Sequence, residues 1–195
     1  MKFIRLSLLL LFVYAGSAYA ATGLWNFDVV NSSITFNMSH MSIIDISGRF
    51  QKFEGKVYTN GGEFDDARFT FTIDALSIYT GNPERDTQFK GNDFFAAYRY
   101  PQIKFESISL KKVKGNNYKL TGDLTIRDVT KTVTFDAVYN GTAVDQRGIT
   151  RAGFKISGEI NRFDYNIKYD ETLKSGTLLF GKTIEIICNI ELINK

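Results

Sequence analysis

The chain has 195 residues, of which 44% are hydrophobic and 14% aromatic, with 24 basic and 21 acidic side chains. This composition is too apolar for a disordered chain and predicts a folded protein. The single histidine and the single cysteine exclude a Cys/His zinc cluster, a two-histidine metalloprotease motif and a disulfide within the chain. The charges form no long run of one sign, so neither nucleic acid nor an anionic membrane surface is an expected partner.

The N-terminus has the pattern of a secretory signal peptide, which we assign to residues 1–20. Lys2 and Arg5 form its positive region, an apolar stretch follows, and a small-x-small cleavage site ends at Ala20. The apolar stretch has roughly half of the about 20 residues that a membrane span requires, so we expect cleavage and no stable membrane anchor. Residues 21–195 should then form a single domain that is periplasmic or secreted.

Period-two alternation dominates the mature chain, and it is typical of strands with one buried face and one solvent-facing side. In residues 33–40, the apolar side chains occupy the even positions up to His40. The predicted strands, in chain order, are residues 24–29, 33–40, 50–59, 68–73, 102–112, 118–126, 132–139, 152–160 and 184–192. About eight or nine strands suit an antiparallel barrel or a sandwich.

Turn-forming residues separate many of these strands. Glycine and asparagine at residues 60–62, 115–117 and 140–141 accept positive φ, and Asp128 is expected to let Arg127-Asp128 close a tight turn. The strands are therefore predicted to run mostly up and down as neighbours.

Residues 80–100 interrupt the strand pattern. Asn82 can cap a helix, Pro83 suits the first helical position, and Glu84 favours the positive end of the helix dipole. One or two short helices are expected in this insertion.

Five groups of turn and aromatic residues follow one another along the mature chain. They are Gly48-Arg49-Phe50; Glu84-Arg85-Asp86 with Asp93-Phe94-Phe95; Tyr100-Pro101-Gln102-Ile103-Lys104-Phe105; residues 120–126 leading to Val129-Thr130-Lys131; and residues 151–154 leading to Arg162-Phe163-Asp164-Tyr165. In this order they resemble the YceI-like polyisoprenoid-binding family. The resemblance implies an all-β fold, an extended lipocalin-like antiparallel β-barrel of about eight strands with a short helical insertion, which binds a long lipid inside the barrel after export.

The alternating strands present an inward apolar face. The residues assigned to binding of the lipid tail are Phe36, Met38, Phe69, Phe71, Ile73, Phe105, Leu120, Leu124, Phe135, Phe154, Ile156 and Ile186, and Ile34, Val133 and Cys188 complete the inward set. From the residues alone, this face forms either a packed core or the wall of a cavity, because an eight-stranded barrel accommodates both. The resemblance favours the cavity.

Three side chains are candidates for binding the lipid head group. His40 continues the inward face near the end of its strand, where it either has a structural partner or meets a head group. Arg85 either pairs with Asp86 on the surface or binds phosphate or carbonyl oxygens in two-point fashion. Arg151 is assigned the same head-group role.

The sequence assigns no catalytic residue, no metal ligand and no cofactor. A Ser-His-Asp triad would need His40, and the chain has no Gly-x-Ser-x-Gly motif and no calcium loop of the DxDxDG type. Together with these absences, the resemblance implies non-catalytic binding and carriage of a long-chain isoprenoid, such as a polyprenyl phosphate, an isoprenoid quinone or its precursor. The alternatives are a solid-core barrel acting in stress protection or adhesion, a binder of fatty acids or fatty amides, and a lipid-modifying enzyme. A homodimer is compatible with each of them.

Overall fold

The computed structural model describes residues 22–61, 64–65 and 67–194, and the predicted signal peptide lies outside them. The described strands are β1 (Thr22–Phe27), β2 (Ser33–His40), β3 (Ile44–Phe50), β4 (Phe53–Asn60), β5 (Arg68–Asp74), β6 (Ile78–Tyr79), β7 (Gln102–Lys114), β8 (Asn117–Ile126), β9 (Val129–Val144), β10 (Thr150–Asn161) and β11 (Phe180–Asn194). One α-helix, α1 (Pro83–Lys90), and two 3-10 helices, η1 (Ala75–Ser77) and η2 (Arg162–Tyr165), complete the described elements.

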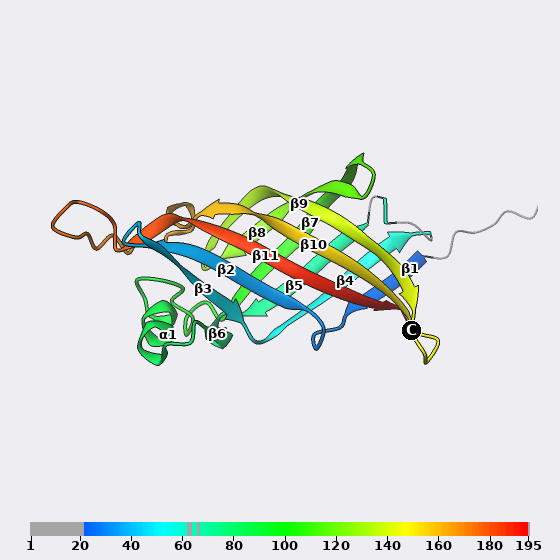
Figure 1. The fold of residues 1–195 in the computed structure, drawn as a ribbon, viewed down its shortest axis with the longest axis horizontal. Coiled ribbons are helices and arrows are strands. Elements are labelled where there is room, and N and C mark those ends of the chain that lie inside the picture. Colours follow the sequence, from blue (N-terminus) through cyan, green and yellow to red (C-terminus); the bar gives the residue numbers. More distant parts are fainter. Residues whose placement is uncertain (1–21, 62–63, 66, 195) are drawn as a thin grey trace, which may run out of the picture.

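Eight of the described strands close into an antiparallel ring in the order β1-β4-β5-β7-β8-β9-β10-β11. β1 closes the ring by pairing with β4 on one side and with the end of β11 on the other, where Asn26 lies opposite Ile193. Figure 1 shows an elongated barrel with α1 at one end and the C-terminus at the other. The predicted antiparallel barrel of about eight strands is confirmed.

A side sheet extends the wall at the α1 end. β2 pairs with the part of β11 that β1 leaves free, β3 pairs with β2, and β6 pairs with β3 at Arg49 and Phe50. α1 follows β6 and lies beside β3 and β6 in Figure 1. The helical insertion therefore lies against the side sheet at this end of the barrel.

The start of α1 agrees with the predicted cap. The Asn82 side chain accepts hydrogen bonds from the backbone N–H groups of Glu84 and Arg85 at 3.0 and 3.1 Å, and Pro83 occupies the first helical position. The helix ends at Lys90, before Gly91.

Two local predictions are wrong. Residues 50–59 do not form one strand, because β3 ends at Phe50 and β4 begins at Phe53, and β3 is absent from the predicted strands. In the turn between β8 and β9, Arg127 and not Asp128 has the positive φ, of 58°. The Arg127 side chain donates to the backbone oxygens of Phe94 and Asn166 at 3.1 and 2.6 Å, and these bonds stabilise the unfavourable backbone conformation.

Aromatic rings stand over glycines on the inner wall. A Cβ atom on Gly122 would lie 2.5 Å from the Phe105 ring, and one on Gly158 would lie 2.5 Å from the Phe135 ring. The Phe105 ring lies 5.0 Å from that of Phe71 and 6.0 Å from that of Phe135. The missing side chains let these three rings form a layer across the barrel.

The half of the barrel beyond this layer, away from α1, is a packed core. The Phe64 ring lies 5.2, 5.3 and 5.0 Å from the rings of Trp25, Tyr139 and Phe154. Phe69 adds an edge contact with Phe154 at 5.3 Å and is completely buried. Interlocked rings therefore fill this half and leave the other half as the place for a ligand.

Candidate functional site

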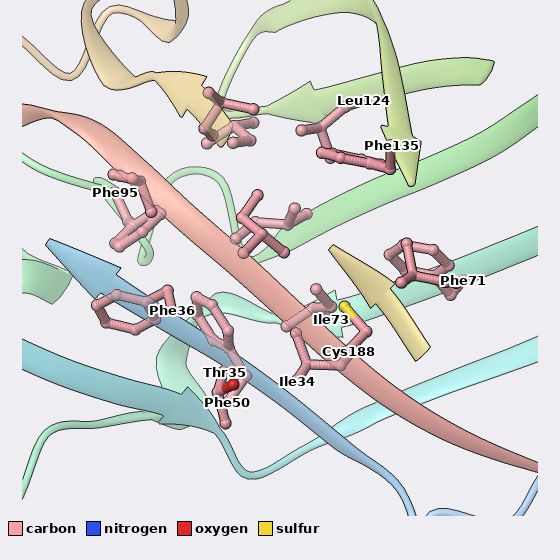
Figure 2. A pocket seen from close by; sticks show the side chains of 16 residues that line it. Ile34, Thr35, Phe36, Phe50, Phe71, Ile73, Phe95, Leu124, Phe135 and Cys188 are labelled. Carbon is pink, nitrogen blue, oxygen red and sulfur yellow. The ribbon is translucent and has the colours of Figure 1, made fainter. Parts of the chain in front are cut away.

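An apolar cavity of about 60 Å³ lies inside the barrel. Its lining residues are Ile34, Thr35, Phe36, Phe50, Phe71, Ile73, Phe95, Ile103, Leu124, Ile126, Phe135, Ile156, Ile160, Ile184, Ile186 and Cys188. Figure 2 shows Phe36, Phe50 and Phe95 grouped at one end of this cavity, with Phe71 and Phe135 toward the other. The cavity therefore occupies the barrel between the aromatic layer and the α1 end.

The alternating pattern of the strands produces this lining. In β8, for example, residues 118, 120, 122, 124 and 126 are buried and the intervening residues are less so. Seven of the predicted tail-binding residues line the cavity: Phe36, Phe71, Ile73, Leu124, Phe135, Ile156 and Ile186. The other five, Met38, Phe69, Phe105, Leu120 and Phe154, are buried outside the lining. The tail-binding set as a whole stays a prediction.

Several lining residues were not in the predicted set. Four of them continue the alternation of a strand on which a nearby inward residue was assigned to the lipid tail. They are Ile103, Ile126, Ile160 and Ile184. Following the alternation to the ends of the predicted strands, two or four residues beyond the assigned ones, would have found them. Phe95 has no such pattern, because it lies after α1 in the insertion and reaches the cavity only through the tertiary fold.

The cavity is electrostatically neutral. Thr35 carries a hydroxyl group, which donates to the backbone oxygen of Ile187 at 2.9 Å and is therefore satisfied. Burial raises the pKa of the Cys188 thiol to about 12, so the thiol is protonated at neutral pH. An apolar cavity of this kind remains dry and accepts hydrocarbon groups.

His40 lies at the α1 end but outside the cavity lining. Its ring is 5.4 Å from that of Phe180, which in turn lies 5.4 Å from Phe89 and 5.5 Å from Phe94. Phe89 lies 6.4 Å from the lining residue Phe36. We call Phe89, Phe94 and Phe180 the aromatic cap, and this cap connects His40 to the cavity.

Arg85 is held within the insertion. Its Nε donates to the Thr80 hydroxyl and its Nη2 to the Thr80 backbone oxygen, both at 2.9 Å. The buried Asp86 carboxylate accepts from the N–H and the hydroxyl of Thr80 at 2.7 and 2.6 Å. Arg85 and Asp86 thus share Thr80 as a partner, and both brace the start of α1.

Arg151 lies at the opposite end of the barrel, where β10 begins. It forms ion pairs with Asp28 and Asp145 at 2.8 Å each and with Glu191. Its hydrogen bonds lower the pKa of Asp28 and of Asp145, and the three carboxylates raise that of Arg151. The structure therefore brings His40 and Arg85 to one end and places Arg151 apart from both.

Arg162 is a buried residue whose role the sequence did not reveal. Its side chain is completely buried and donates to the backbone oxygens of Gly181, Ile167 and Phe180 at 2.8, 2.8 and 2.9 Å. Burial lowers the pKa of this guanidinium. Because its acceptors are uncharged carbonyls next to the aromatic cap, Arg162 fixes the start of β11 beneath the cap.

The described residues lack two other kinds of feature. Among them, no three His, Cys, Asp or Glu side chains gather in a metal-binding arrangement. In the part of the chain that the structure describes, no helix is long and apolar enough to cross a membrane.

The fold and the cavity define a class of antiparallel barrels with an apolar cavity inside. The chain belongs to the YceI family, because the model of the YceI-like domain matches residues 25–192. This confirms the resemblance found in the sequence.

Relatives support this assignment over most of the chain. A UPF0312 protein of Staphylococcus aureus strain N315 is 33% identical over 168 residues, which cover 86% of this chain and 95% of the relative. A UPF0312 protein of Staphylococcus epidermidis strain RP62A is 31% identical over the same coverage.

Solved structures share the fold. BcnA of Burkholderia cenocepacia has a TM-score of 0.74 at 24% identity and covers 85% of this chain and 98% of its own. A YCEI protein of Campylobacter jejuni has a TM-score of 0.64 at 28% identity, over 80% and 89%. A polyisoprenoid binding domain from Saccharophagus degradans has a TM-score of 0.65 at 14% identity, over 88% and 98%.

Proposed function

We propose that this protein binds and carries a long-chain isoprenoid lipid outside the cytoplasm, without covalent chemistry. The observation that carries the proposal is the cavity, which lies in one half of the barrel and is lined mostly by hydrocarbon side chains. The name of the Saccharophagus degradans domain, which describes polyisoprenoid binding, supports the choice of lipid. The signal-peptide pattern of residues 1–20 supports a periplasmic or secreted location.

An unfilled cavity has an energetic cost. At about 24 cal/mol per Å³, a cavity of about 60 Å³ destabilises the fold by about 1.4 kcal/mol. Larger side chains at the isoleucine positions would remove this cost, as the phenylalanines do in the other half of the barrel. A binding function accounts for this cost, because a bound hydrocarbon chain would fill the cavity.

The cavity must expand to hold a whole lipid tail. Sites for ligands of drug size have volumes of about 300–1,000 Å³, several times the volume present here. Among the described lining residues, Phe95 is the one that no strand carries. We therefore assign entry to the α1 end, where movement of Phe95 away from Phe50, now 5.8 Å away, enlarges the cavity without breaking strand pairing.

The head group then lies near the aromatic cap. His40 and Arg85 are both at this end, so they remain our candidates for contact with a phosphate or a quinone carbonyl. Arg151 is a less suitable candidate, because three carboxylates already surround its guanidinium.

Native mass spectrometry of the mature chain tests the proposal. After incubation with a polyprenyl phosphate, an isoprenoid quinone or palmitic acid, we expect retention of an isoprenoid at one molecule per chain. A preference for palmitic acid would instead support the fatty-acid alternative, and turnover of the bound lipid would support an enzyme.

A cavity-filling variant makes this experiment specific. Ile156→Phe adds a ring to the cavity wall and should abolish retention while leaving the fold intact. Ile190→Val, at a buried position outside the lining, should retain lipid like the wild type. Equal retention by the wild type and Ile156→Phe would contradict binding in this cavity.

The small volume supports a second candidate function. If the rings do not move, the barrel is effectively solid and acts through its outer surface as an interaction module. Repeated recovery of lipid-free wild-type protein after exposure to all three lipids would favour this candidate.

A further inference from the structure

The turn between β2 and β3 presents apolar residues to solvent at the end of the barrel that carries α1. Ile43 is 79% exposed and Ile44 is 63% exposed. The neighbouring loop before β11 exposes Leu173, and the Met41 N–H donates to the Leu179 oxygen at 2.9 Å, which ties turn and loop together. We call the exposed Ile43, Ile44 and Leu173, together with the half-buried Met41, the apolar tip.

The backbone of this turn disfavours the residues that occupy it. Met41 and Ser42 have φ values of 53° and 59°, and the Ile43 N–H donates to the His40 oxygen at 3.1 Å. Two consecutive positive φ values in a hairpin turn are typical of type I′, where Asn-Gly is strongly preferred. Methionine and serine here are unfavourable for the backbone, and the two isoleucines that follow are unfavourable in water.

The shape and charge of the tip select its partner. Figure 1 shows the loop before β11 projecting beyond the barrel, with the β2–β3 turn beside it. Residues 41–45 and 168–182 together carry three acidic side chains, Asp45, Asp170 and Glu171, and three basic ones, Lys168, Lys174 and Lys182. A convex aliphatic tip without net charge suits the soft interface of a zwitterionic lipid bilayer, which needs no complementary groove.

We infer that the apolar tip inserts reversibly into the surface of a zwitterionic bilayer and so places the α1 end of the barrel against the membrane. The inference rests on the proposed carrier function for its purpose, because a lipid could then pass between bilayer and cavity without crossing water. The docking itself depends only on the tip.

Flotation of the mature chain with phosphatidylcholine vesicles tests the inference. We expect the wild type to float with the vesicles and the double variant Ile43→Ser/Ile44→Ser to partition at least about tenfold less. Val30→Ser is the control, because Val30 is 88% exposed in the connection between β1 and β2, away from the tip, and it should float like the wild type. Binding should survive an increase from about 0.1 M to about 1 M NaCl, since charge does not drive it.

A second variant keeps the test decisive if the serine variant folds poorly. Met41→Asn/Ser42→Gly supplies the residues that the turn prefers, so it should unfold at higher urea concentration than the wild type. The same variant should partition roughly threefold less onto the vesicles, because it removes an apolar side chain. A rise in stability with a fall in binding separates docking from folding.

The inference is overturned if the wild type does not float, if Val30→Ser loses as much binding as the tip variants, or if high salt releases the protein. Lipid retention in native mass spectrometry is read on the same samples. If the protein retains lipid but does not float with vesicles, membrane docking is wrong and the proposed function stands. If it floats but retains no lipid, docking stands and the proposed function is wrong.

Discussion

At the residue scale, Cys188 reports on the cavity directly. It is the only cysteine of the chain, it lines the cavity, and burial raises its thiol pKa to about 12. The thiolate is the form that attacks thiol reagents, so both burial and the low thiolate fraction protect this residue in the folded chain.

We expect N-ethylmaleimide at about pH 8 to label native Cys188 on the order of a thousandfold more slowly than the unfolded chain. Bound isoprenoid should slow the labelling further, and mass spectrometry measures the rate. Phe95→Leu should speed it, because that ring closes one end of the cavity. Phe64→Leu truncates a buried ring in the packed half and serves as the control; equal effects of the two variants would contradict entry beside Phe95.

Arg151 has a structural role, because it joins three carboxylates by ion pairs. The carboxyl groups of Asp28 and Asp145 have lowered pKa values in the folded chain because Arg151 donates to them. Such groups stabilise the fold above their unfolded pKa of about 3.9 and lose this contribution as the pH falls through their folded values. Arg151 therefore contributes stability at neutral pH that is absent in acid.

Arg151→Gln should accordingly lower the midpoint of urea unfolding at about pH 7, and the difference from the wild type should shrink toward about pH 3. Lipid retention should not change if Arg151 is structural. Lys119→Gln removes the exposed ion pair with Asp136 and should have little effect at either pH. Loss of lipid from Arg151→Gln with unchanged stability would return Arg151 to the head-group site.

At the scale of elements, pairs of glycine and phenylalanine shape the inner wall. Gly122 in β8 leaves room for Phe105, and a Cβ there would also lie 2.6 Å from the backbone oxygen of Glu106. A backbone atom in a paired strand cannot move aside as a side-chain end can. This glycine is thus fixed by its surroundings and not by an unusual φ.

Gly122→Ala should lower the free energy of unfolding by about 1–3 kcal/mol, measured by urea denaturation. Gly153→Ala is the control, because the nearest atom to its added Cβ is the Cβ of Asn140, at 3.3 Å. A similar loss in both variants would contradict the close contacts with Phe105 and Glu106 as its cause.

The elements also show where sequence reasoning succeeds. Alternation located most strands, and Asn82 with Pro83 located α1, because these are local properties of the chain. β3 has the same alternation at Ile44, Ile46 and Phe50, but glycine at position 48 replaces one apolar residue. That glycine is explained only by the Phe36 ring, 2.3 Å from its would-be Cβ, which lies on the neighbouring strand.

At the scale of the whole molecule, the barrel divides into a packed half and a half with a cavity. The inward face of the strands could be read from the sequence, but this division could not. It depends on Phe64 and Phe95, which come from connecting segments and enter opposite halves of the barrel. Neither residue lies in a periodic strand, so only the three-dimensional fold places them.

The seam of the ring joins the first described strand to the last, with Phe27 opposite Leu192. A chain that still lacks β11 during synthesis leaves β10 and β2 each with an unpaired edge. Unpaired edges are prone to intermolecular association. The barrel therefore cannot close before β11 is present, and a shortened chain that ends before β11 exposes two strand edges to association.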